Sequence, residues 1–134
     1  MSSRVFADTS ALYAHLVAND ANHAQANRAL RALAADQAAL ITTSYVLVEI
    51  YALLSRRIGR VAVERFRSDV APLLEIVWID ELLHEQALDL LSERQSRDLS
   101  LVDAASFVVM RHKRLDEALA FDRLFEREGF TLRS

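Results

Sequence analysis

A chain of 134 residues has room for one globular domain of ordinary size. With 52% hydrophobic and 26% charged residues, it lies outside the composition of disordered chains. The 16 Lys and Arg against 19 Asp and Glu give a net charge of −3, which argues against a uniformly basic nucleic-acid-binding surface. No repeat or Gly- or Ser-rich linker divides the chain, so we expect a single domain over residues 1–134.

The composition also excludes several kinds of chemistry. Without Cys, the chain has no disulfide, thiolate-zinc site or thiol nucleophile. The longest uncharged run, residues 37–48, is only twelve residues long and too short to span a bilayer. The first acid, Asp8, comes too early for the apolar region of a signal peptide. We therefore expect a cytoplasmic protein without membrane contact.

Helix and strand signals alternate along the chain. Asp8, Asp20, Ser44 and Ser100 each precede an apolar helical pattern, where a side-chain oxygen can cap free amide groups. Gly59 predicts the end of the third helix. The expected elements, in chain order, are strand 5–7, helices 11–19 and 20–35, strand 40–42, helices 44–58 and 61–70, strand 75–79, helices 82–96 and 100–112, strand 118–121, a turn at 124–128 and strand 130–132.

This alternation predicts a three-layer α/β/α sandwich with a mainly parallel central sheet and right-handed crossovers. In such sheets the functional crevice lies at the carboxyl ends of the strands, where the strand order reverses. Asp8 follows the first expected strand and Asp122 follows a late one. We therefore expect both carboxylates at this edge of the sheet.

Two further acids stand in unusual surroundings. Asp103 lies in the first turn of a helix that is apolar on every side, and an uncompensated buried carboxylate costs several kcal/mol. Glu49 lies in mid-helix, beside Val46 and Leu53, where no helix end needs a cap. Four converging acids require cations, and Mg²⁺ or Mn²⁺ suits a site of carboxylates and water. The four His, at positions 15, 23, 84 and 112, show no metal-ligand spacing.

Each acid also has a purely structural interpretation. Asp8 and Asp122 suit helix or turn caps, and Asp103 with Ser100 fits a capping box. Glu49 could be a boundary residue that reaches water. From the residues alone, both interpretations stay open.

Four segments of the chain resemble the PIN-domain ribonucleases, in particular the VapC-type toxins of bacterial toxin–antitoxin pairs. They occur in the family's order and cover essentially the whole chain. The segments are Val-Phe-Ala-Asp8-Thr9-Ser10, Ser44-Tyr-Val-Leu-Val-Glu49, Arg97-Asp98-Leu-Ser100-Leu-Val-Asp103-Ala-Ala-Ser106 and Ala-Phe-Asp122-Arg-Leu-Phe125.

The resemblance implies an acidic pocket formed by Asp8, Glu49, Asp103 and Asp122, with Asp8 and Asp103 foremost as metal ligands. It also implies Mg²⁺-dependent RNA hydrolysis that leaves a 5′-phosphate, with Mn²⁺ as a possible substitute. The implied partners are a small antitoxin and a second copy of the chain in a homodimer. Supporting roles fall to Thr9 and Ser10, which could orient Asp8 or merely cap a helix, and to Asp98, which we expect outside the ligand set.

The arginines are candidates for substrate contacts. Arg56, Arg57 and Arg60 cluster at a helix end, while Arg97 and Arg94 on one side and Arg111 and Arg114 on the other bracket the Asp103 segment. A solvated helix face is the alternative for all of them. Apolar helix faces in 11–19 and 61–74 could contact the antitoxin or belong to the core.

Two other function classes remain. A receiver-type signalling domain also clusters acids at the strand ends, but it needs a Lys after a late strand, and the only lysine, Lys113, lies at a helix end. A PIN-fold module that binds a partner without cutting RNA is the second alternative. Setting the four acids aside leaves the remaining charges nearly balanced, so the net charge does not exclude RNA.

Overall fold

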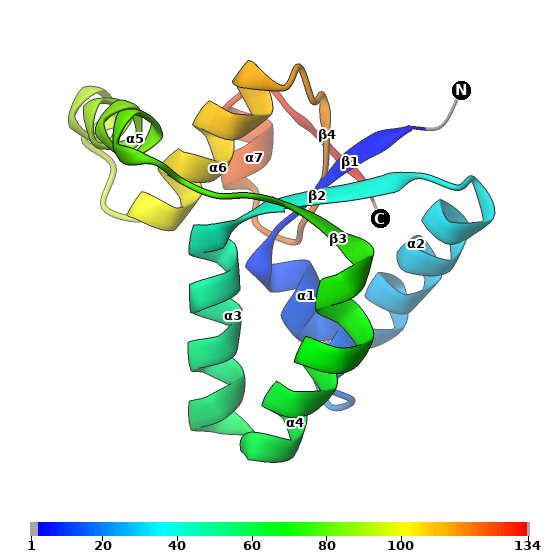
Figure 1. Ribbon diagram of the computed structural model, residues 1–134. Coiled ribbons are helices and arrows are strands. Elements are labelled where there is room, and N and C mark those ends of the chain that lie inside the picture. Colours follow the sequence, from blue (N-terminus) through cyan, green and yellow to red (C-terminus); the bar gives the residue numbers. More distant parts are fainter. Residues whose placement is uncertain (1–2, 134) are drawn as a thin grey trace.

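The computed structural model describes residues 3–133 and confirms the expected α/β/α sandwich (Figure 1). Its five strands stand in the order β3-β2-β1-β4-β5, and every neighbouring pair is parallel. The elements are β1 (Arg4–Ala7), α1 (Thr9–Leu16), α2 (His23–Ala35), β2 (Ala39–Thr43), α3 (Ser44–Arg57), α4 (Arg60–Arg65), a π-helical turn η1 (Phe66–Val70), a 3₁₀ turn η2 (Ala71–Leu73), β3 (Leu74–Val77), α5 (Glu81–Arg94), α6 (Leu101–His112), β4 (Glu117–Leu119), α7 (Leu124–Arg127) and β5 (Thr131–Arg133).

The strand order has a consequence for function. The chain moves outward from β1 through β2 to β3, then crosses back to place β4 on the other side of β1. The order reverses between β1 and β4, so their carboxyl ends flank the crevice expected in such sheets. Receiver-type domains of the doubly wound class use the order 2-1-3-4-5 instead, so the receiver interpretation was wrong.

Helices cover both faces of the sheet. Figure 1 shows the sheet nearly edge-on, with α5, α6 and α7 above it and α1 to α4 below. On the lower side Val5 and Leu119 pack with Ala11, Ala29 and Leu33 of the first two helices. Within the described residues 3–133, no helix is long and apolar enough to cross a membrane.

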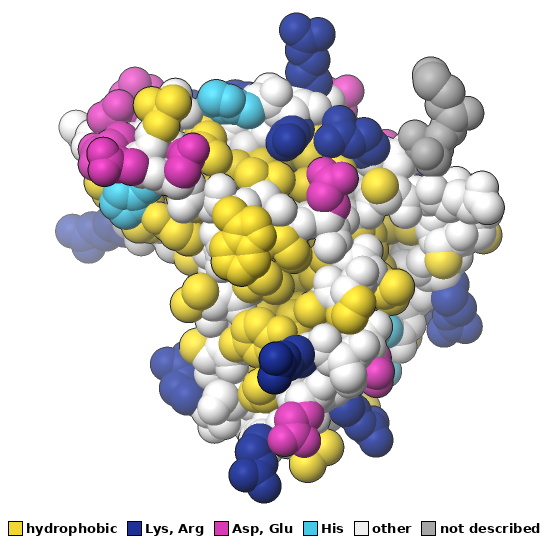
Figure 2. Space-filling view, viewed as in Figure 1, with side chains coloured by type: hydrophobic (Ala, Val, Ile, Leu, Met, Phe, Trp, Pro, Cys, Tyr) yellow, Lys and Arg dark blue, Asp and Glu magenta, His cyan; other side chains and the backbone are white. Residues whose placement is uncertain are grey.

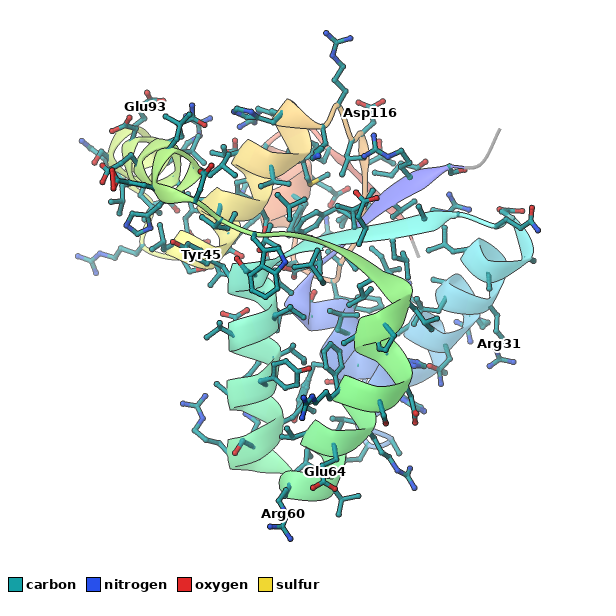
Figure 3. All side chains as sticks on the ribbon, viewed as in Figure 1. Arg31, Tyr45, Arg60, Glu64, Glu93 and Asp116 are labelled. Carbon is teal, nitrogen blue, oxygen red and sulfur yellow. The ribbon has the colours of Figure 1, made fainter. Side chains whose placement is uncertain are left out.

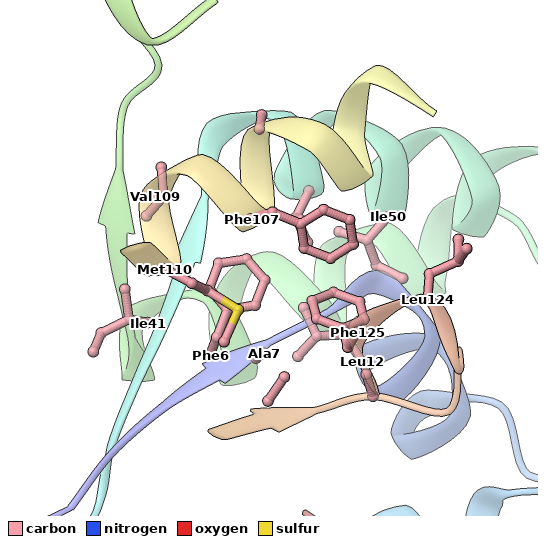
Figure 4. Close-up of a cluster of buried hydrophobic side chains, with 14 of the residues drawn as sticks. Phe6, Ala7, Leu12, Ile41, Ile50, Phe107, Val109, Met110, Leu124 and Phe125 are labelled. Carbon is pink, nitrogen blue, oxygen red and sulfur yellow. The ribbon is translucent and has the colours of Figure 1, made fainter. Parts of the chain in front are cut away.

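Aromatic side chains fill the layer between the sheet and α6. Phe125 stands between Phe6 and Phe107, with ring centroids 6.2 and 5.0 Å away, and Phe107 also stacks on Phe130 at 5.9 Å. Figure 4 shows Met110 beside this group. All residues of α6 from Ala104 to Met110 are buried, as its sequence predicts. This packing fixes the helix that carries Asp103 above β1.

An ion-pair group fastens the far end of the same layer. Glu128 accepts from Arg94 Nε and NH2 of α5, at 2.8 and 3.0 Å, and from Arg111 NH2 of α6 at 2.8 Å. Its side chain is only 11% exposed. Hydrogen bonds from Arg94 foremost, and from Arg111, lower the pKa of Glu128 to about 2, although burial opposes them. Glu128 thereby joins α5, α6 and the end of α7.

Several local predictions need correction. Thr43 rather than Ser44 caps α3, because its Oγ1 accepts from the Val46 amide at 3.1 Å. Ser44 Oγ instead accepts from the Ile79 amide at 2.9 Å, which ties the β3–α5 connection to the start of α3. Asp20 caps no helix, since its Oδ1 accepts from the Asn22 amide and α2 begins one residue later.

Strand and helix ends also differ from the expected ones. β3 ends at Val77 and β4 already at Leu119, so Asp122 does not follow its strand directly. The stretch expected as one helix over 61–70 changes to a π-helical turn at Phe66. Gly59 ends α3 as predicted, with a φ of 130° that other residues rarely adopt.

Candidate active site

The four predicted acids come from four segments that meet near the carboxyl ends of β1 and β4, where the strand order reverses (the switch point). Asp8 caps α1 immediately after β1, and its amide donates to the Leu119 carbonyl of β4 at 3.0 Å. Asp122 lies in the turn between β4 and α7, Asp103 in the first turn of α6, and Glu49 in the second turn of α3. Parallel strands deliver their carboxyl ends to one edge, so the topology itself brings these residues together.

Asp8 is the most buried of the four, with a side chain in a residue only 4% exposed. Its Oδ2 accepts from the Ser10 hydroxyl at 2.8 Å and from the Ser10 amide at 3.3 Å. Both of these bonds go to the same oxygen, and the Thr9 amide also lowers the pKa of the carboxyl. Ser10 and the helix cap therefore engage mainly Oδ2 of Asp8, which leaves Oδ1 free of the Ser10 bonds.

Asp103 and Asp122 follow the same pattern. Ser100 and Asp103 form a reciprocal capping box, in which Asp103 Oδ2 accepts from the Ser100 amide at 3.1 Å. Asp122 Oδ1 accepts from the Leu124 amide at 3.0 Å and closes the turn before α7. Both structural interpretations were thus correct. The bonds from the Ser100 and Leu124 amides each occupy one carboxylate oxygen, so the caps are compatible with a role in the site.

The charges of the four carboxylates act on one another. Burial raises the pKa of Asp8 to about 7; the bond from Ser10 offsets part of the rise, and the charge of Asp103 adds to it. Burial also raises the pKa of Asp103, and the charges of Asp122 and Glu49 raise it further, against the hydrogen bonds from Ser100. Fully ionised, this group is repulsive.

The donor set suits a divalent cation such as Mg²⁺. All four candidate ligands are carboxylates, and Thr9 adds a buried hydroxyl, Oγ1, that has no hydrogen-bond partner in residues 3–133. That part of the chain forms no preassembled ring of three or more metal-ligating side chains. Mg²⁺ commonly binds through one or two carboxylates and several waters, so it needs no such ring. The residues present fit the ion that the resemblance implies.

Ser10 connects two parts of the site. Its Oγ donates to Asp8 and accepts from the Phe121 amide at 3.0 Å, one residue before Asp122. The Ser10 hydroxyl thereby links Asp8 to the turn that carries Asp122. The sequence predicts a supporting role for Ser10, but the bond to Phe121, 111 residues away, leaves no local signal.

Asp98 lies at the rim. Hydrogen bonds to its carboxylate lower the pKa of Asp98, first from the Ser96 hydroxyl and then from Arg127 at 2.8 Å. Neither partner is one of the four acids. Asp98 and Asp122 nevertheless line one hollow of about 590 Å³ together with Arg123 and Arg127. Of the four acids, Asp122 alone lines this hollow, which extends from there along α7.

The candidate arginines differ in their contacts. Arg94 and Arg111 bind Glu128, so they are committed to the fold. Arg57 lies over the Tyr13 ring at 5.4 Å. Arg56 and Arg97 are exposed and form no ion pair within the described residues. Arg56 follows Glu49 by seven residues, which places both on one face of α3 about 10 Å apart along its axis.

Comparisons with known proteins agree with this geometry. The family model described as PIN domain matches residues 5–130. A curated relative, the 23S rRNA-specific endonuclease VapC20 of Mycobacterium tuberculosis, is 37% identical over 127 residues, which are 94% of this chain and 95% of the relative.

Solved structures give the same result. The crystal structure of M. tuberculosis VapC20, described as a sarcin-ricin loop cleaving toxin, superposes with a TM-score of 0.85 at 35% identity, covering 97% of this chain and 99% of that one. The FitAcB structure from Neisseria gonorrhoeae shares the fold, with a TM-score of 0.71 at 14% identity over 97% and 96% of the two chains.

The burial of Asp8 predicts a specific pH dependence of stability. With chelator present, the folded pKa of about 7 exceeds the ordinary value of 3.8, so folding favours the protonated form. The free energy of unfolding should then fall as pH rises from about 4 to about 7, by at most about 4 kcal/mol. Asp8→Asn removes this ionisation. Relative to wild type, the variant should gain stability between pH 4.5 and 8, measured by urea unfolding.

Asp116→Asn supplies the matched control, because Asp116 is exposed at the amino end of β4, away from the four acids (Figure 3). It should follow the wild-type curve at every pH. A constant difference between Asp8→Asn and wild type across this range would contradict the strained carboxylate.

Proposed function

This chain belongs to the PIN-domain family, and on that premise we propose that it is a Mg²⁺-dependent endoribonuclease, the toxin of a toxin–antitoxin pair. Its similarity to a protein named as an rRNA endonuclease confirms the prediction of a nuclease that acts on RNA. The observation that supports the site is the raised pKa of Asp8 and Asp103, caused first by burial and then by the charges of neighbouring acids. We take residues 1–134 as a single domain that acts in the cytoplasm as a homodimer.

The division of labour follows from the contacts. Asp8 and Asp103 would hold the cation through the carboxylate oxygens that the caps leave unbonded, with Glu49 and Asp122 completing the pocket. A bound Mg²⁺, or Mn²⁺ in its place, supplies a Lewis acid that activates water and balances charge on the scissile phosphate. Ser10 keeps Asp8 oriented, and the Thr9 hydroxyl is free to orient water. Hydrolysis leaves a 5′-phosphate.

Arg56 is the substrate contact that the structure favours among the candidates. It shares a face of α3 with Glu49, whereas Arg57 is stacked on Tyr13. A strand whose scissile phosphate lies at the acids could place a neighbouring phosphate within reach of Arg56. Arg97, exposed beside Asp98, is the corresponding candidate at the start of α6. A structured rRNA stem-loop is the substrate class we infer from the relative's target.

A groove below the sheet is our candidate site for the antitoxin. It measures about 650 Å³ and runs between α1, α2 and the η1–η2 turns. Apolar side chains such as Leu12, Leu30 and Val70 line it, with His15 and Asp69 among its polar residues. Leu12 is one helical turn from Asp8, so a peptide in the groove could continue toward the acids. Both helix regions singled out in the sequence contribute to the lining.

Cleavage should depend on the acids and on a divalent cation. With an rRNA stem-loop as substrate, Asp103→Asn should lower kcat at least about 100-fold, because it removes a cation-binding charge. EDTA should abolish cleavage by the wild type, Mg²⁺ should restore it, and new ends should be ligatable as 5′-phosphates. Asp116→Asn is the control. Equal cleavage by Asp103→Asn would contradict the site, and a folded wild type that binds RNA but never cuts it would favour the non-catalytic module.

RNA affinity should report on Arg56. Measured in the Asp103→Asn protein, Arg56→Gln should weaken binding and reduce the slope of log affinity against log salt by about 0.7 to 1, the loss of one phosphate contact. Arg28→Gln, an exposed arginine on α2, should change neither quantity. An unchanged salt slope in Arg56→Gln would remove this arginine from the substrate path.

The groove makes a separate prediction. Ala34 lies exposed on α2 and lines the groove, so Ala34→Arg should block it without disturbing the core. The variant should cleave RNA normally but resist inhibition by the antitoxin in a titration. Ala32→Arg, exposed on the same helix outside the groove lining, should stay fully inhibited. Equal inhibition of both variants would place the antitoxin elsewhere.

A further inference from the structure

A second hollow adjoins the one that begins at Asp122. It measures about 280 Å³ and lies between the end of α5, α6 and α7. It shares Leu124 and Arg127 with the hollow of about 590 Å³ described above, so the two meet at α7. We call the smaller one the inner hollow and the larger one the outer hollow. A ligand that passes Asp122 can therefore place a neighbouring group in the inner hollow.

Part of the inner hollow is apolar. The side chains that form this part belong to residues at least nine-tenths buried: Leu99, Phe107 and Leu124. The volume is well above the about 30 Å³ of one water and close to the about 300 Å³ of small ligand pockets. A flat ring with an apolar face suits this space better than a hydrated ion.

The polar groups of the inner hollow offer mainly N–H donors. Both carboxylate oxygens of Glu128 already accept from Arg94 or Arg111. The Ser96 hydroxyl is engaged as well, since it donates to a carboxylate outside the hollow. In the lining, Arg94 and Arg127 stand against the single acid Glu128. The inner hollow therefore favours a ligand with hydrogen-bond acceptors.

Arg127 is the cation that both hollows share. Its NH2 donates to Asp98 at 2.8 Å, and the two side chains are 59% and 63% exposed. A guanidinium carries five N–H donors, so one bond to Asp98 can hold Arg127 in place while other donors bind a ligand. An ion pair this exposed adds little to stability. Replacing Arg127 should therefore leave the fold intact.

The charges on the surface lead RNA toward these hollows. Figure 2 shows acidic side chains gathered over α5, where an RNA strand would be repelled. The four acids of the site run from Glu49 on α3 to Asp122 just before α7. A strand that passes Arg56 and the acids is thus led to α7, where the outer hollow opens.

We propose that the inner hollow binds the base of a guanosine next to the cleaved bond, with Arg127 donating to its O6 and N7. The outer hollow then holds the sugar and phosphate that join this base to the reacting phosphate. The proposal rests on the ribonuclease function proposed above and adds the base that the site reads. Arg127 is its specificity-determining residue.

The chemistry of the lining selects guanine. A phosphate would meet apolar side chains over much of the inner hollow and lose its water, whereas a base can place its face there. Guanine presents two adjacent acceptors, O6 and N7, and an arginine binds both at once. Adenine sets an amino group beside N7, and that donor would face the donors of Arg127. Unpaired bases in RNA loops expose these edges to proteins.

RNA binding by the Asp103→Asn protein tests the base contact without cleavage. The RNA is a sarcin-ricin stem-loop in which each loop guanosine is replaced in turn by 7-deazaguanosine, which lacks N7, or by inosine, which keeps O6 and N7. At one guanosine, next to the bond that the wild type cuts, 7-deazaguanosine should raise Kd at least about fivefold. Inosine at the same position should leave Kd unchanged.

Adding Arg127→Ala should raise Kd for the unmodified RNA at least about fivefold and remove the difference between guanosine and 7-deazaguanosine. Its thermal midpoint by circular dichroism should match that of the parent protein. Arg123→Ala is the matched control, because Arg123 is 89% exposed and lines the outer hollow only. It removes the same charge but should keep the full preference for guanosine over 7-deazaguanosine.

Two outcomes would overturn the proposal. One is a stem-loop in which no guanosine beside the cut bond responds to 7-deazaguanosine. The other is an Arg127→Ala protein that still distinguishes guanosine from 7-deazaguanosine, which would make Arg127 a phosphate contact at most. Either result leaves the nuclease assignment intact if the wild type cuts RNA. A wild type that never cuts RNA contradicts that assignment instead, and the binding series still decides whether the hollow reads guanine.

Discussion

The burial of carboxylates close to one another at the carboxyl edge of the sheet is the constraint on which the rest of the structure depends. Asp8 is almost completely buried, and its pKa near 7 means that folding at neutral pH works against its charge. Three aspartates reduce this cost in the same way, each giving one oxygen to a backbone amide of the cap or turn that it forms. These hydrogen bonds do not neutralise the negative charge of the carboxylates. A bound divalent cation can balance that charge.

Keeping repelling groups together requires a rigid frame, and the contacts away from the site supply it. The Phe6, Phe107 and Phe125 rings fix α6 over β1, and Glu128 joins α5 to α6 through two arginines. Ser10 then links Asp8 to the turn before Asp122. These elements cannot move apart to relieve the repulsion without breaking buried contacts. The carboxylates are therefore kept close together at a cost in stability, which a bound cation would reduce.

Much of this could be predicted from sequence because it depends on local chemistry. The alternation of strands and helices, the cap at Asp8 and the capping box at Ser100 are short-range patterns, and they led to the fold and to the four acids. The sequence could not decide between cap and site for Asp103, since one carboxylate that forms a cap can also bind a cation. Nor could it show that Thr43 displaces Ser44 as a cap, or that Tyr13 engages Arg57 and leaves Arg56 free. Those outcomes depend on residues brought together only by the tertiary fold.

The distribution of charge matters more for function than its sum of −3. Four acids stand at the switch point and four more along one side of α5, so much of the negative charge occupies two small regions. The first attracts cations, and a bound divalent ion would reverse its effect on a phosphate. The second region, Glu81, Glu85, Asp89 and Glu93, repels RNA, so a substrate strand would approach the acids over α3, where Arg56 is exposed.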